Sequence, residues 1–272
     1  MTHPPGYPQR IVCLTEETTE TLYLLEEDWR IVGISGFTVR PPRARKEKPR
    51  VSAFTSAKIG RIIDLQPDLV LGFSDLQADI AAELVRAGIE VHVFNHRSVA
   101  ETLRMIRTLG GMIGCEARTQ LLVERLTRGL DEVRQRGAAL PRRPRVYFEE
   151  WDEPQISCIR WVSELIAVAG GEDIFPELAV ESLGRNRIMA DPLEVPRRAP
   201  DIILGSWCGK KFQPAQVAAR RGWADVPAIR SGFVREIKSP IILQPGPAAL
   251  TDGVRAIQEV FVEWAENPPN SK

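Results

Sequence analysis

The stretch that decides the fold is residues 116–144, EARTQLLVERLTRGLDEVRQRGAALPRRP. Its apolar residues fall on one helical stripe, with arginine and glutamate on the other sides: Leu122, Leu126, Leu130 and Val133. The pattern stops at Gly137 and Pro141, two residue types that end helices. We therefore predict one helix from about Glu116 to Arg136, roughly 30 Å long. A single stiff helix between two lobes predicts small closing motions.

The sequence on each side of this helix alternates short β-rich runs with amphipathic segments. In the first series the runs are residues 10–14, 30–34, 68–72 and 89–94, with helical segments at 18–26, 56–65, 78–87 and 98–113. In the second series the runs are 145–149, 202–205 and 232–237, with helices near 159–169, 192–198, 214–220 and 248–266. Such alternation predicts mainly parallel sheets. We expect an α/β fold with two Rossmann-like lobes, residues 1–115 and 141–272, joined by a backbone helix over 116–140.

Composition excludes several classes of function. Lys+Arg and Asp+Glu both total 36, so the formal net charge is zero and no basic field attracts nucleic acid. No apolar run approaches the ~20 residues that span a bilayer. The start, MTHPPGYPQRIVCL, lacks the pattern of a secretory signal, so we expect a cytoplasmic location, or a periplasmic one if a leader has been removed. The four cysteines form no CxxC, which predicts reduced, mostly buried thiols and neither a zinc site nor a redox pair.

Several segments together resemble the helical-backbone class of solute-binding proteins, whose members bind vitamin B12, haem or ferric-siderophores for ABC importers. They are RIVCLTEETTETLYLL (10–25), RIVGISGFTVRPPRARKEKPRVSAFTSAKIGRIIDLQPDLVLG (30–72), RVYFEEWDEP (145–154), WVSELIAVAGGEDIF (161–175), GWADVPAIRSGFVREI (222–237) and ILQPGPAAL (242–250). The similarity covers Arg10 to about Trp264. RPP followed by PRVSAF, and AGGEDIF, look most like the vitamin B12-binding branch.

The resemblance implies a ligand cleft between the lobes, at the carboxyl ends of their strands, and a cobalamin-like corrinoid as ligand, with no intrinsic cofactor. The candidate lining residues are Phe37, Arg40, Phe54 and Phe73 in the first lobe and Trp151, Trp207, Trp223 and Gln244 in the second. A corrin or porphyrin has two wide apolar faces and a polar rim. Aromatic planes can cover the faces, and arginine or glutamine can bind the rim.

The sequence departs from the family at its surface and in its acidic segments. Members of the class present a glutamate on each lobe to the permease, but this chain has Gly60 at the first such position, between basic Lys58 and Arg61. An ABC permease is therefore a doubtful partner on this pattern. Acidic residues follow the first strand of each lobe: Glu16, Glu17, Glu149, Glu150, Asp152 and Glu153. They suit a cation or a rim of N–H donors, or are solvated acids at helix starts.

Other functions stay open at this level. His96 and Cys208 each follow a strand, and either could supply an axial ligand to cobalt or iron. The same layout hosts metal-inserting enzymes, but the chain has no GxSxG, P-loop or HExxH, so we expect binding without catalysis. The alternative is that the protein is an importer component that binds haem or another metal chelate.

Overall fold

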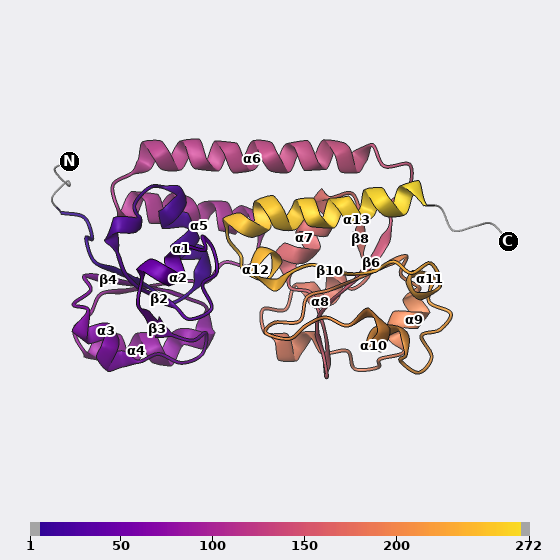
Figure 1. Cartoon of the computed structure of the whole chain (residues 1–272), viewed down its shortest axis with the longest axis horizontal. Coiled ribbons are helices and arrows are strands. Elements are labelled where there is room, and N and C mark those ends of the chain that lie inside the picture. Colours follow the sequence, from indigo (N-terminus) through magenta and orange to yellow (C-terminus); the bar gives the residue numbers. More distant parts are fainter. Residues whose placement is uncertain (1–5, 268–272) are drawn as a thin grey trace. The chain divides into compact units, whose positions relative to one another are not determined.

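The computed structural model describes residues 6–267 and divides them into two compact units (Figure 1). Unit 1 contains the described residues up to His96 together with Ala100–Leu126. Unit 2 contains Arg97–Val99 and the described residues from Thr127 onward. Each unit is built on one sheet covered by helices, so the predicted two-lobed α/β class with mainly parallel sheets is confirmed.

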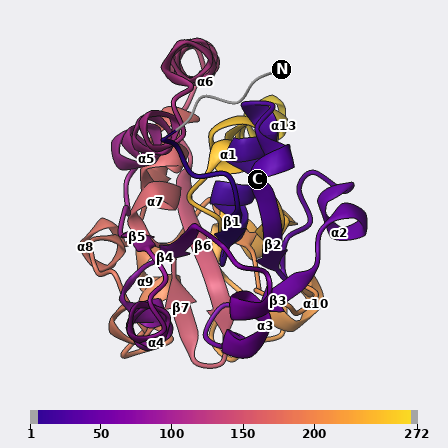
Figure 2. The ribbon, with the colours of Figure 1, turned by 90° about the vertical axis from the view of Figure 1, so that its left-hand side faces the viewer.

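Unit 1 holds a five-stranded sheet in the order β3-β2-β1-β4-β5, and all its neighbouring strands are parallel. The strands are β1 (Ile11–Cys13), β2 (Ile31–Ser35), β3 (Arg50–Ser52), β4 (Leu69–Phe73) and β5 (Val91–Phe94). The helices are α1 (Glu16–Leu24), η1 (Asp28–Arg30), α2 (Ala44–Glu47), α3 (Ile59–Asp64), η2 (Asp75–Gln77), α4 (Ala78–Arg86) and α5 (Val99–Met112). Helices α1 and α5 lie on one face of the sheet, and α3 and α4 on the other (Figure 2).

One core of unit 1 lies between the sheet and the α3 and α4 face. Its buried members are Val12, Leu14, Val51, Ile62, Val70, Ile80 and Leu84. The strand residues are β-branched or leucine, types that pack well on a pleated surface. Because this sheet is parallel and covered on both faces, its strands read as near-continuous apolar runs.

Unit 2 holds a sheet in the order β10-β9-β6-β7, with β8 also pairing β6. The strands are β6 (Arg145–Asp152), β7 (Gln155–Ser157), β8 (Glu172–Asp173), β9 (Ile202–Gly205) and β10 (Val234–Glu236). Strand β7 runs antiparallel to β6, and the other pairs are parallel. The helices are α7 (Arg160–Val168), α8 (Pro176–Ala179), η3 (Gly184–Arg187), α9 (Glu194–Arg198), α10 (Pro214–Ala218), α11 (Pro227–Arg230), α12 (Ser239–Ile242), η4 (Ala249–Gly253) and α13 (Val254–Glu266).

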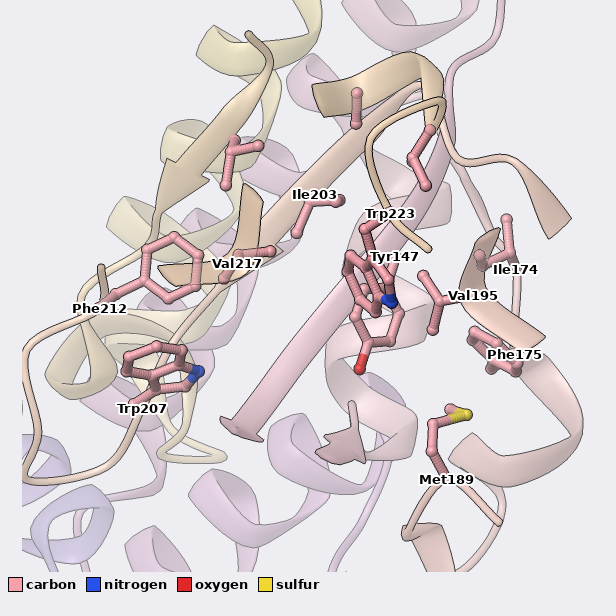
Figure 3. Close-up of a cluster of buried hydrophobic side chains, with 13 residues drawn as sticks. Tyr147, Ile174, Phe175, Met189, Val195, Ile203, Trp207, Phe212, Val217 and Trp223 are labelled. Carbon is pink, nitrogen blue, oxygen red and sulfur yellow. The ribbon is translucent and has the colours of Figure 1, made fainter. Parts of the chain in front are cut away.

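A large aromatic core lies on one face of the unit 2 sheet (Figure 3). Tyr147 of β6 meets Phe175 and Trp223 edge-on, with ring centroids 5.7 and 6.1 Å apart. Trp207 meets Phe212 in the same way at 4.8 Å. Such edge-to-face pairs add stabilisation beyond the area that the rings bury.

Helix α6 (Glu116–Ala138) is one unbroken helix of 23 residues, as the opening pattern predicts (Figure 1). Each apolar residue of the predicted stripe is no more than 3% exposed: Leu122, Leu126, Leu130 and Val133. The chain passes from unit 1 to unit 2 inside this helix, between Leu126 and Thr127. The division into lobes at residues 115/116 and 140/141 stays a prediction.

The structure corrects one predicted boundary in unit 2 and adds a detail to the final helix. Strand β6 does not end at Glu149 but continues to Asp152, because β7 pairs with its last residues. Three of the acidic residues expected to follow this strand, Glu149, Glu150 and Asp152, therefore lie within it. The final helix begins as a π-helix, η4, where Gly253 packs so closely on α12 that an added Cβ would lie 2.2 Å from the carbonyl oxygen of Ile241. Only glycine fits that approach.

Two further predictions concern the membrane and the thiols. Among the helices of residues 6–267, none combines the length and the apolar character needed to cross a bilayer. Cys13, Cys115 and Cys158 are buried, and Cys208 is exposed. Burial raises the pKa of the Cys13 thiol to about 12, and it also raises the pKa values of Cys115 and Cys158. The expectation of mostly buried thiols is confirmed.

Candidate functional site

The aromatic residues expected from unit 1 gather at one edge of its sheet. Phe37 follows β2, Phe54 follows β3, and Phe73 ends β4. Because these strands are parallel, their carboxyl ends meet at the same edge, where open α/β sheets bind ligands. Phe37 is 53% exposed, Phe54 is half-buried and Phe73 is 6% exposed.

Two of these rings, Phe54 and Phe73, form a continuous group with His96, which we call the aromatic ledge. The Phe54 and Phe73 centroids lie 6.5 Å apart, and Phe73 meets His96 edge-on at 5.0 Å. His96 is 3% exposed, so its imidazole is part of the packed ledge. Sequence reasoning treated Phe73 and His96 as separate candidates, and the structure brings them together.

Arg40, the expected cation of this edge, forms an ion pair. Its Nε lies 2.9 Å from Oε1 of Glu20 in α1. Helix α1 is unusual because eight of its nine residues are buried, among them Glu16, Glu17 and Glu20. The two acids after β1 are therefore not in a loop but in the first turn of α1, where the helix dipole favours negative charge.

Glu16 has a strongly perturbed carboxyl group at this edge. Burial raises its pKa from 4.5 to about 7, against a smaller opposing effect of the hydrogen bond from its own backbone. The side chain is 9% exposed. A carboxyl group with this pKa exchanges its proton near neutrality, so it can both donate and accept a hydrogen bond.

In unit 2, Trp151 is the aromatic candidate with accessible surface. It lies near the end of β6, half-buried, and its indole Nε1 donates to the carbonyl oxygen of Glu153 at 2.9 Å. Lys210 places its Nζ 5.7 Å from the centroid of the Trp151 ring and forms an ion pair with Asp152. The sequence pointed to Trp151 but gave no sign of this lysine.

The other two tryptophans are placed differently from the expectation. Trp207 is 2% exposed and Trp223 is 1% exposed, and both belong to the aromatic core (Figure 3). Trp207 does follow a strand, but its ring turns inward against Phe212. Trp223 follows α10 and packs against Tyr147. As they lie, neither offers a face to a ligand, so we correct their assignment to structural residues.

The polar group that turns Trp207 inward is Glu149. This glutamate is completely buried and accepts a hydrogen bond from Trp207 Nε1 at 3.0 Å and from the Tyr147 hydroxyl at 3.1 Å. Arg220 binds the same carboxylate with both terminal nitrogens, at 2.6 and 2.9 Å. A buried charge with this many partners is satisfied and structural. The sequence left two interpretations of Glu149 open, a contact to a ligand and a solvated acid, and the structure places it instead in a buried ion pair.

The remaining acids near the end of β6 fall into two classes. Glu150 binds Arg187 of η3 at 2.6 and 3.2 Å, and Asp152 pairs with Lys210. Glu153 is exposed. Gln244, between α12 and η4, is half-buried. The charges of the two paired acids, Glu150 and Asp152, are therefore offset by neighbouring cations.

Further expected positions concern docking and metal coordination. Gly60 is exposed on α3, with no atom within 4 Å of where a Cβ would be, and the adjoining Lys58 and Arg61 are exposed too. Among residues 6–267, no group of three or more His, Cys, Asp or Glu side chains is arranged to hold a metal ion. Coordination by His96 or Cys208 stays a prediction.

Comparison with known proteins identifies the family. Residues 11–241 match the family model described as periplasmic binding protein. The chain belongs to that family. The predicted resemblance to solute-binding proteins is thereby confirmed, whereas the inter-lobe cleft remains a prediction.

Relatives of this periplasmic binding protein carry several ligand names. It is 26% identical to a vitamin B12-binding protein of Vibrio campbellii, covering 94% of this chain and 89% of the relative. It is 23% identical to an ABC transporter substrate-binding lipoprotein of Bacillus subtilis, covering 93% and 79%. No relative named here supports the expected cytoplasmic location.

Two solved structures share the fold. The periplasmic vitamin B12-binding protein BtuF of Vibrio cholerae has a TM-score of 0.77 at 20% identity, covering 96% of this chain and 99% of that one. The periplasmic haem-binding protein RhuT of Roseiflexus sp. RS-1 has a TM-score of 0.79 at 22% identity, covering 93% and 99%. At these identities the likeness shows the fold alone.

Proposed function

We propose that this periplasmic binding protein binds a cobalamin-like corrinoid, without altering it, through side chains at the carboxyl edges of its sheets. The contacts we assign are Phe37, Phe54 and Phe73 with Glu16 in unit 1, and Trp151 and Gln244 in unit 2. We also assign Arg40, in its ion pair with Glu20, to the polar rim of the ligand. Relatives named for vitamin B12 support this ligand class.

The observation that carries the proposal is the charge state of these edges. The cations Arg40, Arg187, Lys210 and Arg220 each pair with a carboxylate. At the ends of β1 and β2, three buried glutamates, Glu16, Glu17 and Glu20, accompany Arg40, which pairs with Glu20. A corrin rim of neutral amides brings N–H donors to such carboxyl groups, whereas propionates or an anionic ferric-siderophore bring like charge.

The test is a titration with hydroxocobalamin, haem and a ferric-siderophore in separate experiments, followed by the visible spectrum and by heat. We expect saturable binding of hydroxocobalamin and recovery of the intact molecule on denaturation. Preference for haem would replace the corrinoid with the alternative ligand, and no response to any of the three would refute the proposal. Metal appearing in a free tetrapyrrole would show the enzymatic alternative.

The partner and the location belong to the same proposal. We infer that the ligand is collected for uptake, as in the relative named an ABC transporter substrate-binding protein. Since Gly60 replaces the expected glutamate, a permease contact on unit 1 would use other groups, such as Lys58 and Arg61. Fractionation of cells that express the native gene, with immunoblotting, tests where the protein works. A purely cytoplasmic pool would contradict uptake.

A further inference from the structure

A buried glutamine ties together two segments that carry the aromatic ledge. Gln77 ends η2 and is completely buried. Its Oε1 accepts a hydrogen bond from the backbone nitrogen of Phe73 at 2.9 Å, and its Nε2 donates to the carbonyl oxygen of Phe54 at 2.9 Å. One side chain therefore fixes the end of β4 to the turn after β3. An amide is required because it supplies both an acceptor and a donor.

The turn that brings Gln77 into place is strained. Ser74 has φ 67° and ψ 167°, a conformation that is essentially reserved for glycine. Its backbone nitrogen donates to the carbonyl oxygen of Phe94 at 2.7 Å, and its Oγ accepts from the nitrogen of Leu76 at 3.2 Å. Strain of this kind costs about 1–3 kcal/mol and collects at ligand clamps. Its position beside Phe73 points to a function for the turn.

The strand itself makes room for the glutamine. A Cβ added to Gly72 would lie 3.0 Å from Oε1 of Gln77, closer than most real side-chain contacts. Three residues therefore act together in this turn. Gly72 leaves space for the glutamine side chain, Ser74 turns the chain, and Gln77 closes the turn by its hydrogen bonds.

We propose that Gln77 is a positioning residue for ligand binding, because it holds Phe54 beside Phe73 before the ligand arrives. This inference rests on the proposed function, in which both rings contact the ligand. A ring that is already ordered loses little conformational entropy on binding, so affinity depends on the bridge. Gln77 itself is completely buried and acts only through the segments that it joins.

The test is a double-mutant cycle on the dissociation constant for hydroxocobalamin, measured by calorimetry on the full chain. Gln77→Ala should weaken binding about tenfold, and Phe54→Ala by a similar factor. Combined, they should weaken it little more than Phe54→Ala alone, because the glutamine acts through that ring. Gln77→Met keeps the side-chain volume, removes both hydrogen bonds and serves if the alanine variant does not fold.

The matched control is Gln258, a second buried glutamine whose Nε2 donates to a backbone carbonyl, that of Val133, at 2.6 Å. Gln258→Ala should lower the melting temperature and leave the dissociation constant unchanged. Wild-type affinity in a folded Gln77 variant, or multiplication of the two single effects in the double variant, would overturn the inference. Absence of cobalamin binding by the wild type would instead refute the proposed function and this role with it.

Discussion

At the scale of single residues, two tryptophans that look alike in the sequence have different roles. Trp151 and Trp207 each lie near the carboxyl end of a strand, among polar residues. Their exposure separates them, since Trp151 is half-buried and Trp207 is 2% exposed. What the sequence could not show is the carboxylate of Glu149, which binds Trp207 Nε1 from a position 58 residues away.

Substitution of these two tryptophans should affect ligand affinity and protein stability differently. Trp151→Ala should weaken hydroxocobalamin binding by about 1–3 kcal/mol, because an anchoring ring is lost, and should lower stability less than Trp207→Ala, because the Trp151 ring is only partly buried against the aromatic core. Trp207→Ala should lower the free energy of unfolding by about 3–5 kcal/mol, because it leaves a cavity in the core. Calorimetric titration and urea unfolding of both variants check this. A Trp151 variant with wild-type affinity would remove that ring from the site.

The Glu149–Arg220 pair gives a second expectation at this scale. Glu149→Gln leaves the guanidinium of Arg220 without its buried carboxylate, so we expect a loss of about 3–5 kcal/mol in the free energy of unfolding. The control is Glu263→Gln, which breaks a largely exposed pair with Arg235 and should cost no more than about 1 kcal/mol. Equal losses in urea unfolding would show that burial is not what makes the first pair strong.

At the scale of elements, α1 is unusual because it is polar in sequence and almost entirely buried. Its sequence, EETTETLYL, has weak amphipathic character, and the structure nevertheless buries eight of its nine residues. Three threonine hydroxyls find hydrogen-bond partners within this segment, because they donate to backbone carbonyls one turn earlier: Thr18, Thr19 and Thr21. For the buried carboxyl of Glu16, the hydrogen bond from its own backbone does not offset the effect of burial, so its pKa is raised.

The pKa of Glu16 predicts how stability changes with pH. Its folded-state pKa of about 7 lies above the ordinary value of 4.5, so the folded protein binds more protons between these limits. The contribution is fully present below pH 4.5 and is lost as pH rises to 7, on the order of 3 kcal/mol. Glu16→Gln should remove this dependence. Urea unfolding at four pH values from 4.5 to 7.5 tests it, and parallel curves for the two proteins would disprove it.

Helix α6 contains two glycines that respond oppositely to the same change. Gly129 has only a nitrogen of Arg255, at 3.9 Å, near an added Cβ, so Gly129→Ala should stabilise the protein by about 0.5–1 kcal/mol. At Gly137 an added Cβ would lie 2.7 Å from the backbone of Ala169, so Gly137→Ala should destabilise it. Melting temperatures of the two variants are the measurement. A lower melting temperature for Gly129→Ala would contradict the expectation.

At the scale of the whole molecule, periodic patterns predicted more than isolated residues did. The stripe of α6, the seven main strands and the order of elements followed from apolar spacing and alternation, because burial imposes those periods. Strands β3, β7 and β8 hold at most one apolar residue each, too few to show a period, whereas the equally short β1 and β10 lie within the longer predicted runs 10–14 and 232–237. The binding-site candidates were predicted less well, because Trp207, Trp223 and Glu149 are oriented by partners distant in sequence.

The different burial of the four thiols should allow a dye to be attached to the protein at a single cysteine. Three are buried, with pKa values raised by burial, and only Cys208 presents its sulfur to solvent, one residue after Trp207 and two before Lys210. A maleimide dye at neutral pH should therefore label one position without any engineering. Because Lys210 lies beside Trp151, a fluorophore at Cys208 would report the arrival of a coloured corrinoid by quenching.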